Sequence, residues 1–164
     1  MVYIKYVETK LGKIGIVEKD NKIVKVIIIN GSKENSKRNK NDYDNYQEKD
    51  TELLLKAKKE LEEYFKGKRK EFDLPLEQEG TEFQKKVWNA LEKIPYGETR
   101  TYKEVAKMVG NEKACRAVGM ANNKNNIPIF VPCHRVIGSN GKLVGYALGL
   151  DMKKYLLDLE SKNK

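Results

Sequence analysis

Residues 101–121 read TYKEVAKMVGNEKACRAVGMA, and this stretch decides how the C-terminal half of the chain is organised. Thr101, with Glu104 three residues later, forms a capping-box pattern that opens a short helix. Gly110 turns the chain, and a second helix is expected over about 113–121. Two short helices around such a turn have the outline of a helix-turn-helix, although many helical hairpins share this outline without binding DNA.

The second of these helices carries small residues and a single long basic one. A helix that reads base edges in the major groove presents several long polar side chains, and this helix offers only Arg116. Its small residues either pack against neighbouring helices or let the helix approach the narrow minor groove through phosphate contacts. We favour packing for the alanines, and the role of Arg116 stays open. The small residues are Ala114, Ala117, Gly119 and Ala121.

Beyond this helix, residues 127–137 read IPIFVPCHRVI. This apolar run between prolines is expected to be buried, yet it leads to Cys133 and to His134, the only histidine of the chain. A free cysteine alone is more often a small buried hydrophobe than a nucleophile. The adjacent histidine favours a nucleophile, because a thiolate needs a base. Neighbouring side chains of an extended chain point to opposite faces, so we expect a bridging water between the two unless the backbone turns.

The group that orients His134 is sought in the last helix, expected over 151–160. Glu160 follows Leu156 by four residues and therefore lies on or beside the apolar stripe of that helix. A carboxylate there needs a partner, since burying an unpaired charge is unfavourable. His134 is a candidate partner, and the alternative is a frayed glutamate in solvent. The stripe consists of Met152, Tyr155, Leu156 and Leu159.

Towards the N-terminus, Thr81 and Gln84 form another capping-box pattern, which is expected to open a helix. Residues 77–80 are expected to link two domains, 1–77 and 78–164. The inward face of the helix is predicted to carry Phe83, Val87, Trp88 and Leu91.

The N-terminal residues show strand periodicity. Alternating apolar residues predict strands over 2–8 and 13–29, and a turn at 19–22 makes the latter part of a hairpin or meander. The fold is therefore expected to be a mixed α/β (α+β) one, strand-rich at the start and mostly helical in the second half.

The almost wholly polar residues 31–50 lack apolar periodicity and are expected to form a mobile loop. Thr51 can cap a helix over 52–66 that ends at Gly67. Residues 70–76 are expected to form a short extended piece.

The charge of the chain is uneven. It carries 33 basic and 24 acidic residues, a net charge of +9. Residues 99–164 carry 12 basic and 5 acidic residues, whereas residues 1–98 carry 21 and 19, so the excess lies in the helical half. Such a concentration favours a polyanionic partner, with nucleic acid first. The alternative is a solvated lysine-rich surface.

The composition excludes several classes of protein. Two cysteines and one histidine cannot form a four-ligand zinc site, and they argue for a reducing compartment rather than a disulfide scaffold. No run approaches the roughly 18 apolar residues that span a bilayer, and the N-terminus has no secretory pattern. We therefore expect a cytoplasmic protein without a metal, a cofactor or a membrane partner.

The segment Pro132-Cys133-His134-Arg135-Val136 resembles the active-site motif of the O6-alkylguanine-DNA alkyltransferases, suicide proteins of DNA repair. The resemblance covers about residues 81–160, with several motifs in the same order. These are Phe83-Gln84, Val87-Trp88, Ile94-Pro95-Tyr96-Gly97-Glu98-Thr99, Tyr102, Arg116-Ala117-Val118-Gly119, Asn125, Pro128, Gly145-Tyr146 and Leu156-Leu157 with Glu160.

The resemblance implies a role for each matching residue of the reaction centre. Cys133 is then the alkyl acceptor, His134 its base through a water, and Glu160 the group that orients His134. Asn125 ties down the backbone of the site, and Tyr102 donates to ring nitrogen 3 of the departing guanine.

For DNA and base recognition, the resemblance implies that Arg116 fills the gap left by a flipped nucleotide. It places Ala114, Cys115, Ala117, Gly119 and Arg135 at the DNA surface, with Cys115 taking no part in the chemistry. The guanine pocket includes Tyr102, Val136, Tyr146 and Ala147, and the carbonyls of Cys133 and Val136 accept from the guanine amino group. Ala147 stands where some members have serine, but the family contact there uses the backbone N–H.

The fold that the resemblance implies is an N-terminal α/β domain like ribonuclease H and a helical C-terminal domain with a helix-turn-helix. The implied function is irreversible transfer of an alkyl group from O6 of guanine in double-stranded DNA to Cys133, by a monomer that acts once. One alternative is a non-catalytic protein that binds alkylated DNA. A weaker alternative is a thiol hydrolase, which would turn over and give Arg116 no purpose.

Overall fold

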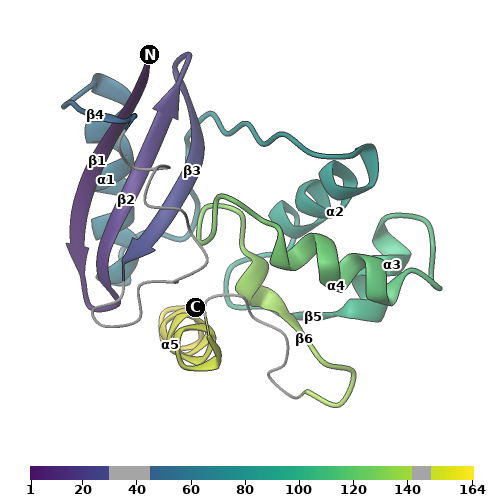
Figure 1. The fold of residues 1–164 in the computed structure, drawn as a ribbon. Coiled ribbons are helices and arrows are strands. Elements are labelled where there is room, and N and C mark those ends of the chain that lie inside the picture. The colour runs from purple at the N-terminus through teal and green to yellow at the C-terminus, as the bar shows by residue number, and fades with distance from the viewer. Residues whose placement is uncertain (30–44, 142–148) are drawn as a thin grey trace. The chain divides into compact units, whose positions relative to one another are not determined.

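The computed structural model describes residues 1–29, 45–141 and 149–164. The chain forms two compact units, Met1–Gln78 and Glu79–Lys164 (Figure 1). The expected mixed architecture is confirmed, with a sheet and one helix in the first unit and mostly helices in the second. None of the helices in the described ranges is both long enough and apolar enough to cross a membrane.

The first unit is built on an antiparallel meander of β1 (Val2–Thr9), β2 (Gly12–Lys19) and β3 (Lys22–Ile29). The turn between β2 and β3 falls at Asp20 and Asn21, both with positive φ, as a two-residue hairpin turn requires. The predicted strands and turn are therefore confirmed. The apolar side chains of Ile4, Val17 and Ile27 form a buried cluster in this sheet.

A short strand overturns part of the loop predicted over 31–50. β4 (Gln47–Glu48) pairs in parallel with β1 and gives the sheet the order β3-β2-β1-β4. Both β4 residues are exposed, so this edge pairing rests on backbone hydrogen bonds and leaves no apolar pattern in the sequence. The prediction for residues 30–44 lies outside the described residues.

Helix α1 (Glu52–Phe65) packs on β1 and β2 (Figure 1). The Thr51 hydroxyl accepts from the Leu54 N–H at 3.0 Å and donates to Glu18 at 2.7 Å, so the predicted N-cap also joins the helix to the sheet. Within the extended piece that follows, the Pro75 carbonyl accepts from Ile23 N–H at 2.8 Å.

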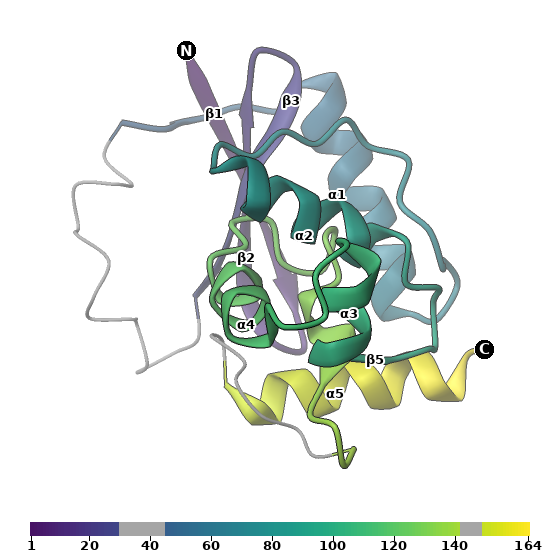
Figure 2. The ribbon, with the colours of Figure 1, turned by 90° about the vertical axis from the view of Figure 1, so that its right-hand side faces the viewer.

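The second unit begins with α2 (Glu82–Glu92), α3 (Tyr102–Met108) and α4 (Cys115–Asn123). The capping boxes predicted at Thr81 and Thr101 are both present. The three helices pack against one another, and Figure 2 shows α3 beside α4. The Trp88 indole N–H donates to the Ala121 carbonyl at 2.9 Å, which fastens α2 to α4.

Helix α4 starts and ends later than the predicted range 113–121. The Asn111 side chain accepts from Lys113 N–H at 3.1 Å, so a side-chain turn occupies the expected first residues of the helix. Of the predicted inward face of α2, Val87, Trp88 and Leu91 are buried and Phe83 is partly exposed.

The remaining elements of this unit place the start of α3 and the last helix next to the Cys-His segment. β5 (Arg100–Thr101) pairs in parallel with β6 (Val136–Ile137), so the start of α3 lies next to the end of the Cys-His segment. A 3-10 turn, η2 (Cys133–Arg135), precedes β6, and α5 (Leu150–Lys162) packs against this turn.

Candidate active site

The apolar segment before Cys133 is buried, as predicted, and the side chain of Asn125, two residues after the end of α4, holds it. The Asn125 amide donates to the Val131 carbonyl at 2.9 Å, and its oxygen accepts from Ile127 N–H at 3.0 Å. Within this loop Ile129 has a φ of 74°, which is rare for a β-branched residue. The contacts of Asn125 close the loop around this strained residue.

Cys133 itself is buried and opens the turn η2. The backbone bends here, because Arg135 N–H donates to the Pro132 carbonyl at 3.0 Å and Val136 N–H donates to the Cys133 carbonyl. The backbone therefore turns at Cys133, which is the exception that the sequence prediction allowed, and the opposite faces of an extended chain do not apply to Cys133 and His134.

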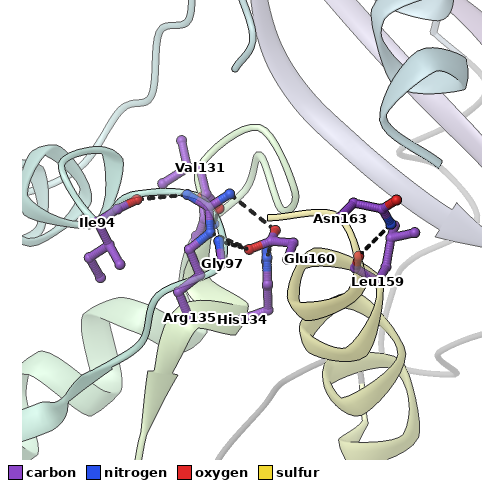
Figure 3. A network of polar contacts seen from close by, with 9 residues as sticks. Ile94, Gly97, Val131, His134, Arg135, Leu159, Glu160 and Asn163 are labelled. Carbon is purple, nitrogen blue, oxygen red and sulfur yellow. Dashed lines mark hydrogen bonds and ion pairs between the residues drawn. The ribbon is translucent and has the colours of Figure 1, made fainter. Parts of the chain in front are cut away.

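Glu160 lies in the interior, so its alternative placement in solvent is excluded. His134 Nε2 donates to Glu160 Oε2 at 2.6 Å (Figure 3). The other carboxylate oxygen, Oε1, accepts from Gly97 N–H at 3.2 Å. The carboxylate therefore joins the last helix, the η2 turn and the loop after α2.

Arg135 completes this network and is not a surface residue. Its Nε donates to Glu160 Oε1 at 2.8 Å, its Nη2 to Oε2 at 3.0 Å, and its Nη1 to the Ile94 carbonyl at 2.7 Å (Figure 3). Its exposed fraction is 6%. The assignment of Arg135 to the DNA surface is therefore wrong, because all three nitrogens of its guanidinium are committed to partners inside the protein.

The charges of this network follow from its hydrogen bonds. Burial alone would raise the pKa of Glu160, but the hydrogen bond that His134 donates, together with the hydrogen bonds and positive charge of Arg135, outweighs burial and holds the pKa far below its ordinary value. Burial lowers the pKa of His134, and this outweighs the opposing effect of the hydrogen bond that His134 donates to Glu160 and of the negative charge of Glu160. Glu160 is therefore ionised, with Arg135 as its counter-charge, and His134 is neutral at pH 7.

This arrangement fixes the tautomer of His134. Because Nε2 carries the proton donated to Glu160, Nδ1 presents a lone pair. Nδ1 is buried and makes no hydrogen bond to any of the described residues. A neutral imidazole with a basic nitrogen beside a cysteine has the composition of a nucleophile and its base.

Tyr102, the first residue of α3, lies close enough to Cys133 for the two groups to affect each other. Burial raises the pKa of Tyr102, and the negative charge of a Cys133 thiolate raises it further. The phenol is therefore a hydrogen-bond donor over the whole neutral range. A Cβ placed on Gly119 of α4 would come within 3.8 Å of this ring, so α4 also passes close to Tyr102.

The burial of the α4 residues shows which of its small residues pack inside the protein. Val118, Ala121 and Asn122 face inward, and Arg116 and Ala117 are exposed. Packing is thus the right interpretation for Ala121 and the wrong one for Ala117. Ala114, Cys115 and Gly119 are partly exposed beside them.

Two buried polar residues escaped the sequence analysis. The Asn122 amide donates to the Cys133 carbonyl at 3.3 Å, which links α4 directly to Cys133. The Lys153 ammonium, on α5, donates to the Val136 carbonyl. The signal for Lys153 was present, since Lys153, Leu156 and Glu160 follow one another at helical spacing, but a lysine at the edge of an apolar stripe is usually solvated.

Two expected pocket residues, Tyr146 and Ala147, lie outside the described residues. The described ranges contain no group of three or more side chains of the kinds that hold a metal ion.

Two family models match the chain, both described as parts of 6-O-methylguanine DNA methyltransferase. The ribonuclease-like domain matches residues 1–78, and the DNA binding domain matches residues 82–162.

Several known proteins are similar to this chain over more than two thirds of their own length. The methylated-DNA–protein-cysteine methyltransferase of Methanosarcina acetivorans is 66% identical over 66% of this chain and 70% of its own. The constitutive methylated-DNA–protein-cysteine methyltransferase of Bacillus subtilis is 49% identical over 98% of this chain and 96% of its own. A crystal structure of the Mycobacterium tuberculosis protein OGT in complex with DNA has a TM-score of 0.86 and 38% identity over 98% of this chain and 94% of that one. The chain therefore belongs to the 6-O-methylguanine DNA methyltransferase family.

Proposed function

We propose that this protein repairs DNA by moving an alkyl group from O6 of guanine to the sulfur of its own Cys133. The observation that carries the proposal is the buried arrangement of Cys133 beside a neutral His134 whose tautomer is fixed by Glu160. The names of the relatives from Methanosarcina acetivorans and Bacillus subtilis support the same reaction.

The reaction begins with loss of the thiol proton. A water between Sγ and Nδ1 of His134 would carry this proton to the imidazole, and the ionised Glu160 would stabilise the imidazolium that forms. The thiolate then attacks the alkyl carbon in line. A carbon–sulfur bond forms, the bond from carbon to O6 breaks, and its electron pair stays with guanine.

The departing guanine gains negative charge, which needs donors in place beforehand. The raised pKa of Tyr102 keeps its phenol protonated, which supports a role as a hydrogen-bond donor. We assign the acceptor of this hydrogen bond to ring nitrogen 3 of guanine. The carbonyls of Cys133 and Val136 are proposed to accept from the guanine amino group. Each already accepts from a buried side chain, Asn122 or Lys153, which holds it in place. Tyr146 and Ala147 are proposed to line the same pocket.

DNA is proposed to bind through α3 and α4 as a helix-turn-helix, with the exposed face of α4 in the minor groove. The exposure of Arg116 and Ala117 supports this placement, and the structure of the Mycobacterium tuberculosis protein in complex with DNA supports DNA as the partner. A base inside the duplex must be rotated out before its O6 can be reached, which costs a few kcal/mol of stacking. Arg116 would occupy the space that the base leaves.

The thioether product is a poor leaving group, and none of the described side chains around Cys133 could displace it. We therefore propose a single turnover per protein molecule, without a cofactor. This separates the proposal from a thiol hydrolase, which would release its product and continue.

The pH dependence of His134→Gln tests the proposed base. Single-turnover transfer from duplex DNA that contains O6-methylguanine is expected to slow by roughly 10²–10⁴-fold at neutral pH. Raising the pH towards the ordinary thiol pKa of about 8.5 should restore part of the rate. Lys154→Gln, an exposed residue of α5, is the control and should transfer normally. A defect of equal size at every pH would contradict the role of His134 as the base.

A further inference from the structure

Helix α5 places two buried charges of opposite sign against the turn that carries the nucleophile. Lys153 and Glu160 lie two helical turns apart on one face, and both have an exposed fraction of 0%. Glu160 contacts His134 and Arg135 of η2, and Lys153 donates to the carbonyl of Val136, the next residue. In the proposed function Glu160 orients His134, whereas Lys153 only holds the Val136 carbonyl and its charge has no role.

A fully buried ammonium is unfavourable unless something compensates its charge. Burial accordingly lowers the pKa of Lys153, and the negative charge of a Cys133 thiolate opposes this effect. The same thiolate raises the pKa of Tyr102 on α3. The sulfur therefore lies within electrostatic reach of groups on both α3 and α5.

The other charged groups around the nucleophile already balance. Glu160 is paired with Arg135 through both carboxylate oxygens, and Tyr96 lies beside this pair. His134 is neutral, since burial lowers its pKa. Among the described residues around this turn, the charges that remain are the ammonium of Lys153 and the sulfur of Cys133 when it is ionised.

We propose that Lys153 is the counter-ion of the Cys133 thiolate and, resting on the proposed function, of the guanine that leaves. During the transfer a carbon–sulfur bond forms, the bond from carbon to O6 breaks, and one negative charge moves from sulfur to guanine. The net charge of the pocket is unchanged by this step. A fixed cation nearby therefore stabilises the negative charge on the sulfur before the transfer and on the guanine after it. Lys153 acts through the sulfur, as a positioning residue, by raising the fraction of thiolate that can react.

The test compares four substitutions in a Cys115→Ser background, where Cys133 is the sole thiol. Lys153→Met removes both the charge and the donor, Lys153→Gln keeps a donor for the Val136 carbonyl without the charge, and Lys153→Arg keeps the charge. Lys154→Met removes an exposed charge from the same helix and is the matched control. The rate of Cys133 alkylation by iodoacetamide, followed by intact mass between pH 4 and 10, gives the thiol pKa.

We expect Lys153→Met and Lys153→Gln to raise the thiol pKa by roughly one to three units, as for the loss of a nearby opposite charge. Lys153→Arg should restore much of the shift, and Lys154→Met should leave the pKa unchanged. The pH profile of methyl transfer should move upward with the thiol pKa. Circular dichroism shows whether each variant folds. If Lys153→Met does not fold, the thiol pKa values of Lys153→Gln and Lys153→Arg decide the question.

A folded Lys153→Gln with the wild-type thiol pKa would overturn the proposal. The proposed function fails by a different result, namely that the wild-type protein takes no methyl group from DNA. In that case a raised thiol pKa in Lys153→Gln would still support Lys153 as the counter-ion of the thiolate, because iodoacetamide probes the thiol without DNA.

Discussion

His134 Nε2 lies 2.6 Å from Glu160 Oε2, and both side chains are buried. The two residues are 26 positions apart in the chain, so the contact depends on α5 packing against η2. Arg135 shares the same carboxylate. Glu160 therefore orients the imidazole of His134 and also neutralises the buried guanidinium of Arg135.

Replacing Glu160 by glutamine is expected to damage both functions. Arg135 would lose its counter-charge inside the protein, and breaking a buried ion pair in this way typically destabilises a fold by about 3–5 kcal/mol. His134 would lose the acceptor that fixes its tautomer, so methyl transfer should slow as well. Urea unfolding and single-turnover transfer measure the two effects. Asp158→Asn, on the exposed side of α5, should change neither, and wild-type stability in Glu160→Gln would contradict the ion pair.

Protein stability is expected to fall with decreasing pH below about 6.5, the ordinary pKa of histidine. The pKa of His134 is lowered in the folded state, so the unfolded chain takes up the proton first and acid favours unfolding. His134 is the only histidine, and His134→Gln should remove this dependence between pH 5 and 7. Glu92, whose pKa burial raises, acts in the opposite direction and is present in both proteins. The free energy of unfolding is measured between pH 5 and 7 for both proteins. If it changed with pH in the same way in the wild type as in His134→Gln, this result would contradict a neutral His134.

The elements that could be predicted from the sequence are those with local causes. The capping boxes at Thr81 and Thr101 act within three residues, and the meander follows from alternating apolar side chains and a two-residue turn. β4 could not be predicted, because its exposed residues join the sheet through backbone hydrogen bonds to β1.

Cys133, His134 and Glu160 could also be chosen as candidate site residues from residue type and spacing. The sequence alone left a solvated Glu160 as an alternative, which the burial of Glu160 excludes. Arg135 could not be placed, since nothing in its neighbours distinguishes an arginine that contacts DNA from one that turns inward to Glu160. The same holds for Lys153 and Asn122, whose partners are backbone carbonyls far away in the chain. Long-range contacts of this kind leave no periodic pattern.

Cys133→Ala should abolish transfer and leave DNA affinity close to that of the wild type. Affinity is expected to come from phosphate contacts of the α4 face, and Cys133 is buried behind that helix. Fluorescence anisotropy with a labelled duplex at fixed salt measures the affinity. A large loss of binding in a folded Cys133→Ala protein would indicate that Cys133 has a structural role instead.

Arg116→Ala should slow repair of duplex DNA strongly and leave transfer from free O6-alkylguanine almost unchanged. The reason is that only the duplex requires a base to leave its stack. Arg116→Lys should recover little, because a compact ammonium does not replace a planar guanidinium that stacks. Lys124→Ala, which removes an exposed charge after the end of α4, is the control.

Single-turnover rates at saturating duplex separate this role of Arg116 from a phosphate contact. A phosphate contact would weaken binding and make its salt dependence shallower, and saturating DNA would then restore the rate. Equal losses on duplex and free base would contradict base flipping by Arg116.

The stoichiometry of transfer tests the central claim most directly. The protein is mixed with an excess of duplex that contains O6-methylguanine, and intact mass and peptide mapping follow the product with time. We expect the gain of one methyl group per protein molecule, located on Cys133 and absent from Cys115, with repaired guanine reaching a plateau at one equivalent. Repaired guanine that continues to accumulate beyond one equivalent, or a methyl group on any other residue, would contradict the account.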